Sequence, residues 1–152
     1  MKLHECLSEK TIEVRSGLKD RDAVLSKLTG LLLAPSHFMD AETLLAEMQA
    51  REKLGSTGIG EGVAIPHVHL KGIRGLNVAM MTLENAIDFG AIDDQPCFIF
   101  IMVVGPDDDR DAYLKLLSEV SRMLHHESAR KSVLAAATPA ELLKVLRESD
   151  VS

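Results

Sequence analysis

The chain has 152 residues, of which 46% are hydrophobic, 26% charged and only 3% aromatic, and its formal net charge at pH 7 is −6. A chain of this length and composition can bury roughly two thirds of its unfolded surface without a disulfide or metal, so we expect one soluble domain over residues 1–152. The negative charge disfavours nucleic acid as the main partner, because phosphate binding needs clustered Lys and Arg.

Cys6 and Cys97 are too few and too far apart in sequence for a disulfide framework or a Cys-x-x-Cys metal site, and we expect neither a metal nor a cofactor. The amino terminus, Met1–Lys10, is too charged for a signal peptide, and no apolar run approaches the ~20 residues of a membrane span. We therefore expect free thiols, no membrane insertion and a cytoplasmic location.

The amino-terminal part predicts one strand and two helices. Alternation over Thr11–Val14 predicts a short strand. A helix should follow from Asp20, which can cap it, to Pro35, and a second helix begins after Asp40. Their apolar stripes are expected to be Ala23, Val24, Leu28, Leu31 and Leu32 in the first helix, and Leu44, Leu45, Met48 and Leu54 in the second.

A glycine-rich stretch follows, Arg51-Glu-Lys-Leu-Gly-Ser-Thr-Gly-Ile-Gly-Glu-Gly-Val-Ala-Ile-Pro-His67-Val-His69, with Arg51 on the last turn of the second helix. The glycines can bring main-chain N–H groups close to a ligand, so this loop can hold an anion. Val63–Ile65 is predicted to be a short buried strand that Pro66 stops at His67. His67 should then be held rigidly, with its ring towards solvent or a partner.

Two apolar runs further along predict the centre of a sheet. Leu76–Leu83 predicts a strand, and Cys97–Val104, which is apolar on both faces, predicts a central strand covered by helices on each side. Gly105-Pro106 should end that strand. Ile87–Pro96, between the two runs, is interpreted as a loop with a turn at Asp93-Asp94.

The remainder of the chain predicts helices. An acidic run, Asp107–Asp111, should open the first, because acids are favoured at the positive end of a helix. Its buried stripe is expected to be Leu114, Leu117, Val120, Ser121 and Leu124. His125-His126 marks a break, a further helix covers Ser128–Ala136, and Thr138-Pro139-Ala-Glu141 starts the last. These strands and amphipathic helices indicate an α/β fold, a mixed β-sheet flanked by helices on both faces.

The stretch from Arg51 to His67 resembles the signature of the enzyme IIA domains of the fructose/mannitol/nitrogen class (type 2) in the bacterial phosphoenolpyruvate-dependent phosphotransferase system. Ile87–Pro96, the Gly105-Pro106 break, the Leu-rich helix after it and the closing Thr-Pro-Ala-Glu-Leu-Leu segment resemble the rest of that domain. The likeness covers almost the whole chain. Its closest match is the nitrogen-regulatory branch, mainly through Ile87–Pro96.

The resemblance implies that His67 accepts a phosphoryl group from an HPr-like histidine phosphocarrier protein, with Arg51 beside it. The residues agree with this chemistry, since a neutral imidazole is a good nucleophile near pH 7 and a transferring phosphoryl group needs positioning and charge compensation. Ser56 and Thr57 are predicted to offer hydroxyl or backbone N–H groups to the phosphoryl oxygens, so that no metal is required.

Tyr113 departs from the family pattern, because many members have a second active-site histidine at the matching position. A tyrosine can still hydrogen-bond a phosphate, but it stays neutral and supplies no imidazolium. His69 is a secondary candidate for phosphate binding. In extended geometry it faces the same side as His67, and otherwise it is a solvated loop histidine.

Three functions stay open at this level. The protein can be a regulator whose phosphorylation, which adds about −1.5 to −2 charge, changes its affinity for other proteins. It can be a sugar-specific component that passes the phosphoryl group to a IIB partner. It can also be a binding module that has kept the fold and lost phosphorylation. A nucleotide site is not expected, because the loop lacks the Lys-Ser/Thr ending of a P-loop.

Overall fold

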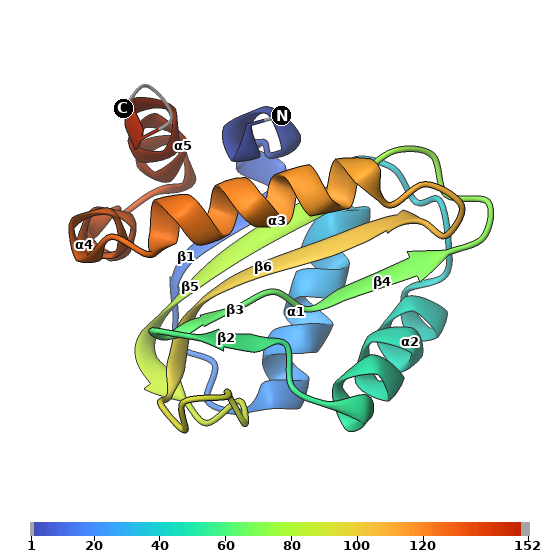
Figure 1. The fold of residues 1–152 in the computed structure, drawn as a ribbon, viewed down its shortest axis with the longest axis horizontal. Coiled ribbons are helices and arrows are strands. Elements are labelled where there is room, and N and C mark those ends of the chain that lie inside the picture. The colour runs from blue at the N-terminus through green and yellow to red at the C-terminus, as the bar shows by residue number, and fades with distance from the viewer. Residues whose placement is uncertain (1, 150–152) are drawn as a thin grey trace.

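A computed structural model describes residues 2–149, which form a six-stranded mixed sheet with helices on both faces (Figure 1). The strands are β1 (Ile12–Ser16), β2 (Gly58–Gly60), β3 (Val63–Ala64), β4 (His67–Leu70), β5 (Asn77–Ile87) and β6 (Cys97–Pro106). The helices are α1 (Arg21–Leu33), α2 (Ala41–Leu54), α3 (Asp111–Leu124), α4 (Glu127–Ala135) and α5 (Pro139–Ser149), and short 3₁₀ turns at Leu3–Cys6 and Glu9–Thr11 precede β1. The predicted fold class is confirmed.

Strand β6 is the centre of the sheet, whose order is β1-β5-β6-β3-β2 with β4 also on β6. It pairs antiparallel with β5 and parallel with both β3 and β4. The registers Val63↔Ile99 and His67↔Val103 place β3 and β4 one after the other along the same edge of β6. The carbonyl of Pro66, between them, accepts a hydrogen bond of 2.9 Å from the Val103 N–H. The two short strands therefore behave as one strand interrupted at the proline.

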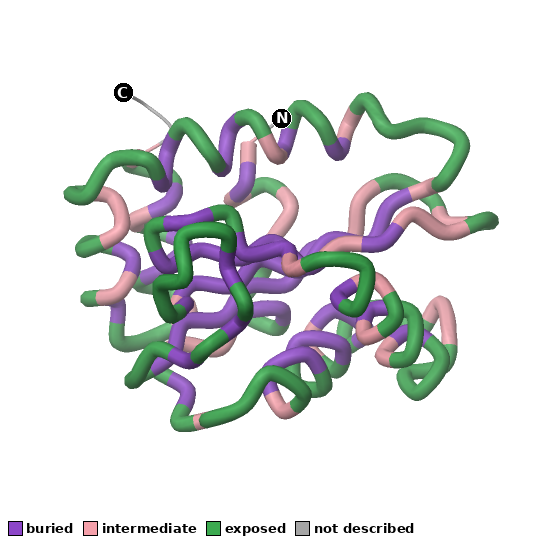
Figure 2. The backbone as a smooth tube through the Cα atoms, turned by 60° about the horizontal axis from the view of Figure 1, so that its bottom comes forward, coloured by how far each residue is buried: buried purple, intermediate pink, exposed green. Residues whose placement is uncertain are grey.

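Each face of the sheet has its own apolar core, because successive side chains of a strand point to opposite faces. On one face, Met80 and Ile101 pack with the buried side chains of α3, α4 and α5. On the other face, Met81 and Met102 pack with those of α1 and α2. Figure 2 shows the buried backbone gathered in the middle of the molecule, between helices whose outer turns are exposed.

Three predicted helix starts are confirmed by hydrogen bonds to the capping side chain. Asp20 Oδ1 accepts from the Ala23 N–H at 2.8 Å, and Asp40 Oδ2 accepts from the Thr43 N–H at 3.1 Å. Thr138 Oγ1 accepts from the Glu141 N–H at 3.1 Å, where Pro139 opens α5. Each cap satisfies an N–H group that has no partner within the helix.

The predicted helix stripes need two corrections. Leu114 and Ser121 are exposed, and the buried residues of α3 are Tyr113, Leu116, Glu119, Val120, Met123 and Leu124. The stripe begins one residue earlier than predicted, because Tyr113 packs inwards. In α2, Leu54 is 85% exposed, and the inward position of the last turn belongs to Glu52.

The strands also differ from the prediction at several points. Pro66 does not end strand pairing, because its carbonyl still accepts a hydrogen bond and β4 continues over His67–Leu70. Gly58–Gly60, expected to be part of a loop, pairs with β3, and β5 runs on to Ile87. Both cysteines are free thiols, as predicted. Among the described residues, no helix has the length and apolarity needed to cross a membrane.

Candidate phosphoryl-transfer site

His67 is the first residue of β4 and is held by a hydrogen bond to the backbone. Its Nδ1 lies 2.7 Å from the carbonyl oxygen of Ile65. A carbonyl oxygen can only accept, so Nδ1 must carry the proton and donate it. In the neutral ring, Nε2 therefore keeps its lone pair. This is the tautomer that a nucleophile at Nε2 needs.

Three of the predicted site residues form one cluster of rings. The ring centroids of His67 and Tyr113 lie 4.9 Å apart, those of His69 and Tyr113 4.8 Å, and those of His67 and His69 6.0 Å. His67 and His69 come from the same face of β4, and Tyr113 comes from the first turn of α3. The interpretation of His69 as facing the same side as His67 is confirmed. Its part in phosphate binding stays a prediction.

Arg51 and Arg110 supply positive charge at this cluster. Burial lowers the pKa of His67; the hydrogen bond to Ile65 acts in the opposite direction, and the charges of Arg51 and Arg110 lower that pKa further. Arg51 is anchored on the last turn of α2, where its Nη1 donates to the Gly55 carbonyl at 2.8 Å. The structure thus places the predicted cation within electrostatic reach of a neutral, half-buried imidazole.

Arg110 is a site residue that the sequence interpretation missed. It caps the amino end of α3, and its charge lowers the pKa of His69 and of Tyr113, although burial raises the pKa of Tyr113 overall. The available signal was its place as the lone cation in the acidic run Asp107–Asp111, directly after the central strand. Such a cation lies at the carboxyl end of β6, beside β4.

Ser56 and Thr57 hold the glycine-rich loop through their hydroxyls. Ser56 Oγ donates to the Phe89 carbonyl at 2.7 Å and accepts from the Gly58 N–H at 3.0 Å. Thr57 is buried; its Oγ1 donates a short hydrogen bond to Glu52 Oε1, and its N–H donates to Glu52 Oε2 at 3.2 Å. Both hydroxyls are therefore engaged within the protein, and their role as phosphate donors stays a prediction.

Comparisons with known proteins identify the family. A family model described as "Phosphoenolpyruvate-dependent sugar phosphotransferase system, EIIA 2" matches residues 5–149. The chain belongs to this family. The resemblance inferred from the Arg51–His67 stretch is therefore confirmed.

Relatives of both regulatory and sugar-specific kinds are similar to this EIIA 2 chain. A nitrogen regulatory protein of Pseudomonas aeruginosa is 33% identical over 135 residues, covering 89% of this chain and 86% of the relative. A fructose-specific EIIA component of Haloferax volcanii is 30% identical over 128 residues, covering 84% and 83%. The solved structure of the nitrogen regulatory protein IIA-Ntr from Neisseria meningitidis superimposes with a TM-score of 0.87 at 25% identity, covering 95% of this chain and 98% of that one.

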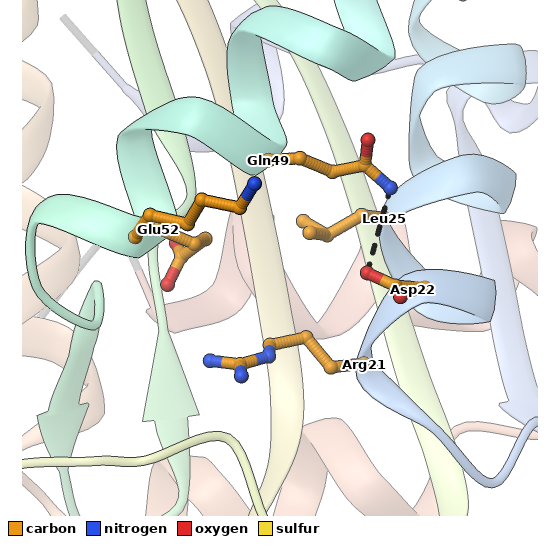
Figure 3. A pocket seen from close by; sticks show the side chains of 6 residues that line it. Arg21, Asp22, Leu25, Gln49 and Glu52 are labelled. Atoms are coloured by element: carbon orange, nitrogen blue, oxygen red, sulfur yellow. Dashed lines mark hydrogen bonds between the residues drawn. The ribbon is translucent and has the colours of Figure 1, made fainter.

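A pocket of about 320 Å³ lies between α1 and α2 of this EIIA 2 domain (Figure 3), and no residue of the ring cluster lines it. It is lined by Arg21, Asp22, Leu25, Gln49, Glu52 and Lys53. Gln49 Nε2 donates to Asp22 Oδ1 at 3.5 Å across its rim, and the guanidinium of Arg21 lies 5.8 Å from the centre of the Phe89 ring. The pocket shares Glu52 with the loop that Thr57 anchors.

Proposed function

We propose that His67 is phosphorylated by a histidine phosphocarrier protein of the phosphoenolpyruvate-dependent phosphotransferase system. The observation that carries this proposal is the 2.7 Å contact between His67 Nδ1 and the Ile65 carbonyl, which leaves the lone pair on Nε2. The charges of Arg51 and Arg110 near the same ring support it, because they can offset the negative charge of an incoming phosphoryl group.

The chemistry needs no further co-reactant. Nε2 of His67 attacks phosphorus while the P–N bond of the donor's phosphohistidine breaks, and the donor imidazole leaves with that bond's electron pair. The His67 ring gains positive character as the new P–N bond forms. The Nδ1–H bond to the Ile65 carbonyl then becomes charge-assisted and stabilises the phosphorylated ring. Catalysis is mainly positioning and electrostatic stabilisation, as in other phosphoryl transfers.

The phosphorylated protein is proposed to act as a nitrogen-type regulator. Support comes from the 33% identity to a nitrogen regulatory protein and from the TM-score of 0.87 to the IIA-Ntr structure. Phosphorylation adds about −1.5 to −2 charge at a partly apolar surface, which repels some protein partners and recruits others. The exposed side chain of Leu114, beside Tyr113 on α3, is part of the apolar surface there.

Incubation with phosphoenolpyruvate and the general phosphotransfer proteins tests the first step. An acid-labile phosphoryl adduct should form on the wild-type protein and vanish in His67→Ala. His37→Ala is the matched control, since His37 is exposed and lies outside the ring cluster, and it should be phosphorylated like wild type. Absence of an adduct on the wild-type protein would overturn the proposal.

A sugar-specific role is the second candidate, favoured by the 30% identity to a fructose-specific EIIA component. In that role the phosphoryl group passes from His67 to a IIB partner. Sugar phosphorylation in an assay reconstituted with IIB and permease components distinguishes the two roles. A regulator keeps its phosphoryl group in that assay, whereas a transport component loses it at the rate at which sugar phosphate appears.

A further inference from the structure

Glu52 is a buried carboxylate one residue away from Arg51, and nothing in the proposed transfer chemistry uses it yet. Consecutive residues of an α-helix point roughly 100° apart, so the last turn of α2 presents Arg51 towards the site and Glu52 towards the interior. The side chain of Glu52 is only 7% exposed. We propose that Glu52 is a positioning residue, which fixes the tautomer and orientation of His67 through Thr57 and Ile65.

A continuous series of hydrogen bonds connects the carboxylate to the imidazole. The two carboxylate oxygens of Glu52 accept from the N–H and the hydroxyl of Thr57. The carbonyl of Thr57 accepts from the Ile65 N–H at 3.0 Å. The carbonyl of the same Ile65 accepts from His67 Nδ1 at 2.7 Å. The position in which Glu52 holds Thr57 therefore sets the orientation of the backbone on both sides of Ile65. That orientation places the Ile65 carbonyl, the acceptor that selects the His67 tautomer.

The loop needs such an anchor because its own sequence restrains it weakly. Glycines stand on both sides of the Ser56-Thr57 pair, and glycine backbones can adopt many conformations. Ser56 restrains the loop from the Phe89 side, at 2.7 Å from that carbonyl. Thr57 restrains it from the side that leads to Ile65 and His67. A buried carboxylate without these two donors would also be costly, so Glu52 and Thr57 hold each other in place.

The carboxylate cannot be replaced by an amide without loss. An ionised carboxylate offers two acceptor oxygens, which match the two donors of Thr57. In Glu52→Gln one oxygen becomes an NH₂ donor. Facing the Thr57 N–H, it meets another donor; facing the Thr57 hydroxyl, it makes that hydroxyl turn to accept, and the hydroxyl proton loses its carboxylate acceptor. Thr57→Val removes the hydroxyl donor and keeps the N–H. Both variants keep side-chain volume nearly constant, so they test the hydrogen bonds more than the packing.

This inference rests on the proposed function of His67, but its first readout does not require a phosphoryl donor. Nitrogen NMR of the unphosphorylated protein, at a pH where the imidazole is neutral, distinguishes a protonated from an unprotonated ring nitrogen. Wild type should show a protonated Nδ1 and an unprotonated Nε2. In Glu52→Gln and Thr57→Val the two shifts of His67 should move towards each other, because the second tautomer becomes populated. Glu47→Gln, an exposed charge loss on the same helix, should leave them unchanged.

The second readout is the phosphorylation rate from the phosphocarrier. It should fall on the order of tenfold in both variants and stay unchanged in Glu47→Gln, because small errors in nucleophile position are expensive in transfer reactions. Wild-type nitrogen shifts in Glu52→Gln and Thr57→Val would overturn the inference, and so would a tautomer change without a change in rate. If Glu52→Gln fails to fold, Thr57→Val decides the question. A wild-type protein that is not phosphorylated at all would instead refute the proposed function. The nitrogen shifts would still show whether Glu52 fixes the His67 tautomer.

Discussion

His67 and His69 lie two residues apart on β4, yet their ring nitrogens have different surroundings. Nδ1 of His67 donates to the Ile65 carbonyl, which fixes one tautomer. Nδ1 of His69 is buried and has no hydrogen-bond partner in the part of the chain that the structure describes. Burial, Arg110 and His67 lower the pKa of His69, and a backbone interaction with Pro106 acts in the opposite direction. The 2.7 Å contact of His67 Nδ1 with a backbone carbonyl is what leaves Nε2 of that ring free to attack.

The pH dependence of the site follows from the lowered pKa of His67. Burial first, and then the charges of Arg51 and Arg110, stabilise the neutral ring and hold this pKa below the ordinary imidazole value of 6.5. Phosphorylation should therefore stay fast as the pH falls through about 6.5 and decline only below it. Arg110→Gln removes one repelling charge, so the NMR titration midpoint of His67 should rise. Arg122→Gln, an exposed cation on α3, should leave it unchanged, and equal midpoints in both variants would contradict the role of Arg110.

Protonation of His67 should also affect stability. Because the folded pKa lies below the unfolded one, the neutral ring contributes stability that is fully present above about pH 6.5 and is lost as the pH falls through the folded pKa.

Tyr113 occupies the position at which the resemblance implies a second histidine in many family members. Its ring lies 4.9 Å from that of His67 and is 7% exposed. In Tyr113→His the new imidazole can carry a charge beside the phosphoryl group, so the lifetime or the transfer rate of that group should change with little effect on folding. Tyr113→Phe keeps the ring and serves as the control. Unchanged kinetics in Tyr113→His would remove Tyr113 from the site.

At the scale of elements, the interrupted strand formed by β3 and β4 positions His67, the proposed nucleophile. Parallel pairing of both strands with β6 fixes the backbone on each side of Pro66, at Ala64↔Phe100 and at His67↔Val103. The interruption frees the Ile65 carbonyl from the sheet and directs it to His67. The start of α3, with Arg110 and Tyr113, then closes over the carboxyl end of β6.

The segment before this strand should tolerate alanine poorly at Gly58, where the nearest atoms include backbone. A Cβ on Gly58 would lie 2.7 Å from the Ala91 Cβ and 2.8 Å from its Cα, which is backbone and cannot move away easily. Gly58→Ala should lower the free energy of unfolding by about 1–3 kcal/mol, as other overpacked positions do. Gly30→Ala is the contrasting variant, since a Cβ there meets nothing within 4 Å and the residue lies within α1. It should raise that free energy by about 0.5–1 kcal/mol, and denaturant unfolding of the two variants measures both values.

Much of this element layout could be predicted from the sequence, and the exceptions have physical causes. Helices and the strands β1, β5 and β6 carry their own apolar periodicity or caps. Strand β2 carries no such signal, because Gly58–Gly60 pairs through its backbone alone. Strand β4 was not predicted because Pro66 was expected to end the pairing, although its carbonyl still accepts a hydrogen bond from the Val103 N–H. At the site, His67 and Arg51 lie in one recognisable stretch. Arg110 offered one signal, its place as the lone cation in the acidic run, but its role and that of Glu52 depend on which elements meet in space.

For the whole molecule, one sheet contributes side chains to two apolar cores, one on each face. Leu28 of α1 packs on one face and Leu142 of α5 on the other, and both are fully buried. Each Leu→Ala substitution should cost about 2–5 kcal/mol of unfolding free energy. Because the two residues belong to separate buried clusters on opposite faces, the double variant should lose the sum of the two within about 0.5 kcal/mol, in a single denaturant transition. Separate transitions for the two faces would contradict a cooperative fold.

The position of the phosphoryl group on the His67 ring tests the proposed chemistry most directly. Phosphorus–nitrogen coupling in NMR spectra of the ¹⁵N-labelled, phosphorylated protein identifies the bonded nitrogen. We predict a bond to Nε2 of His67, with Nδ1 still protonated and donating to the Ile65 carbonyl. A phosphoryl group on Nδ1 of His67, or on any other residue, would contradict it.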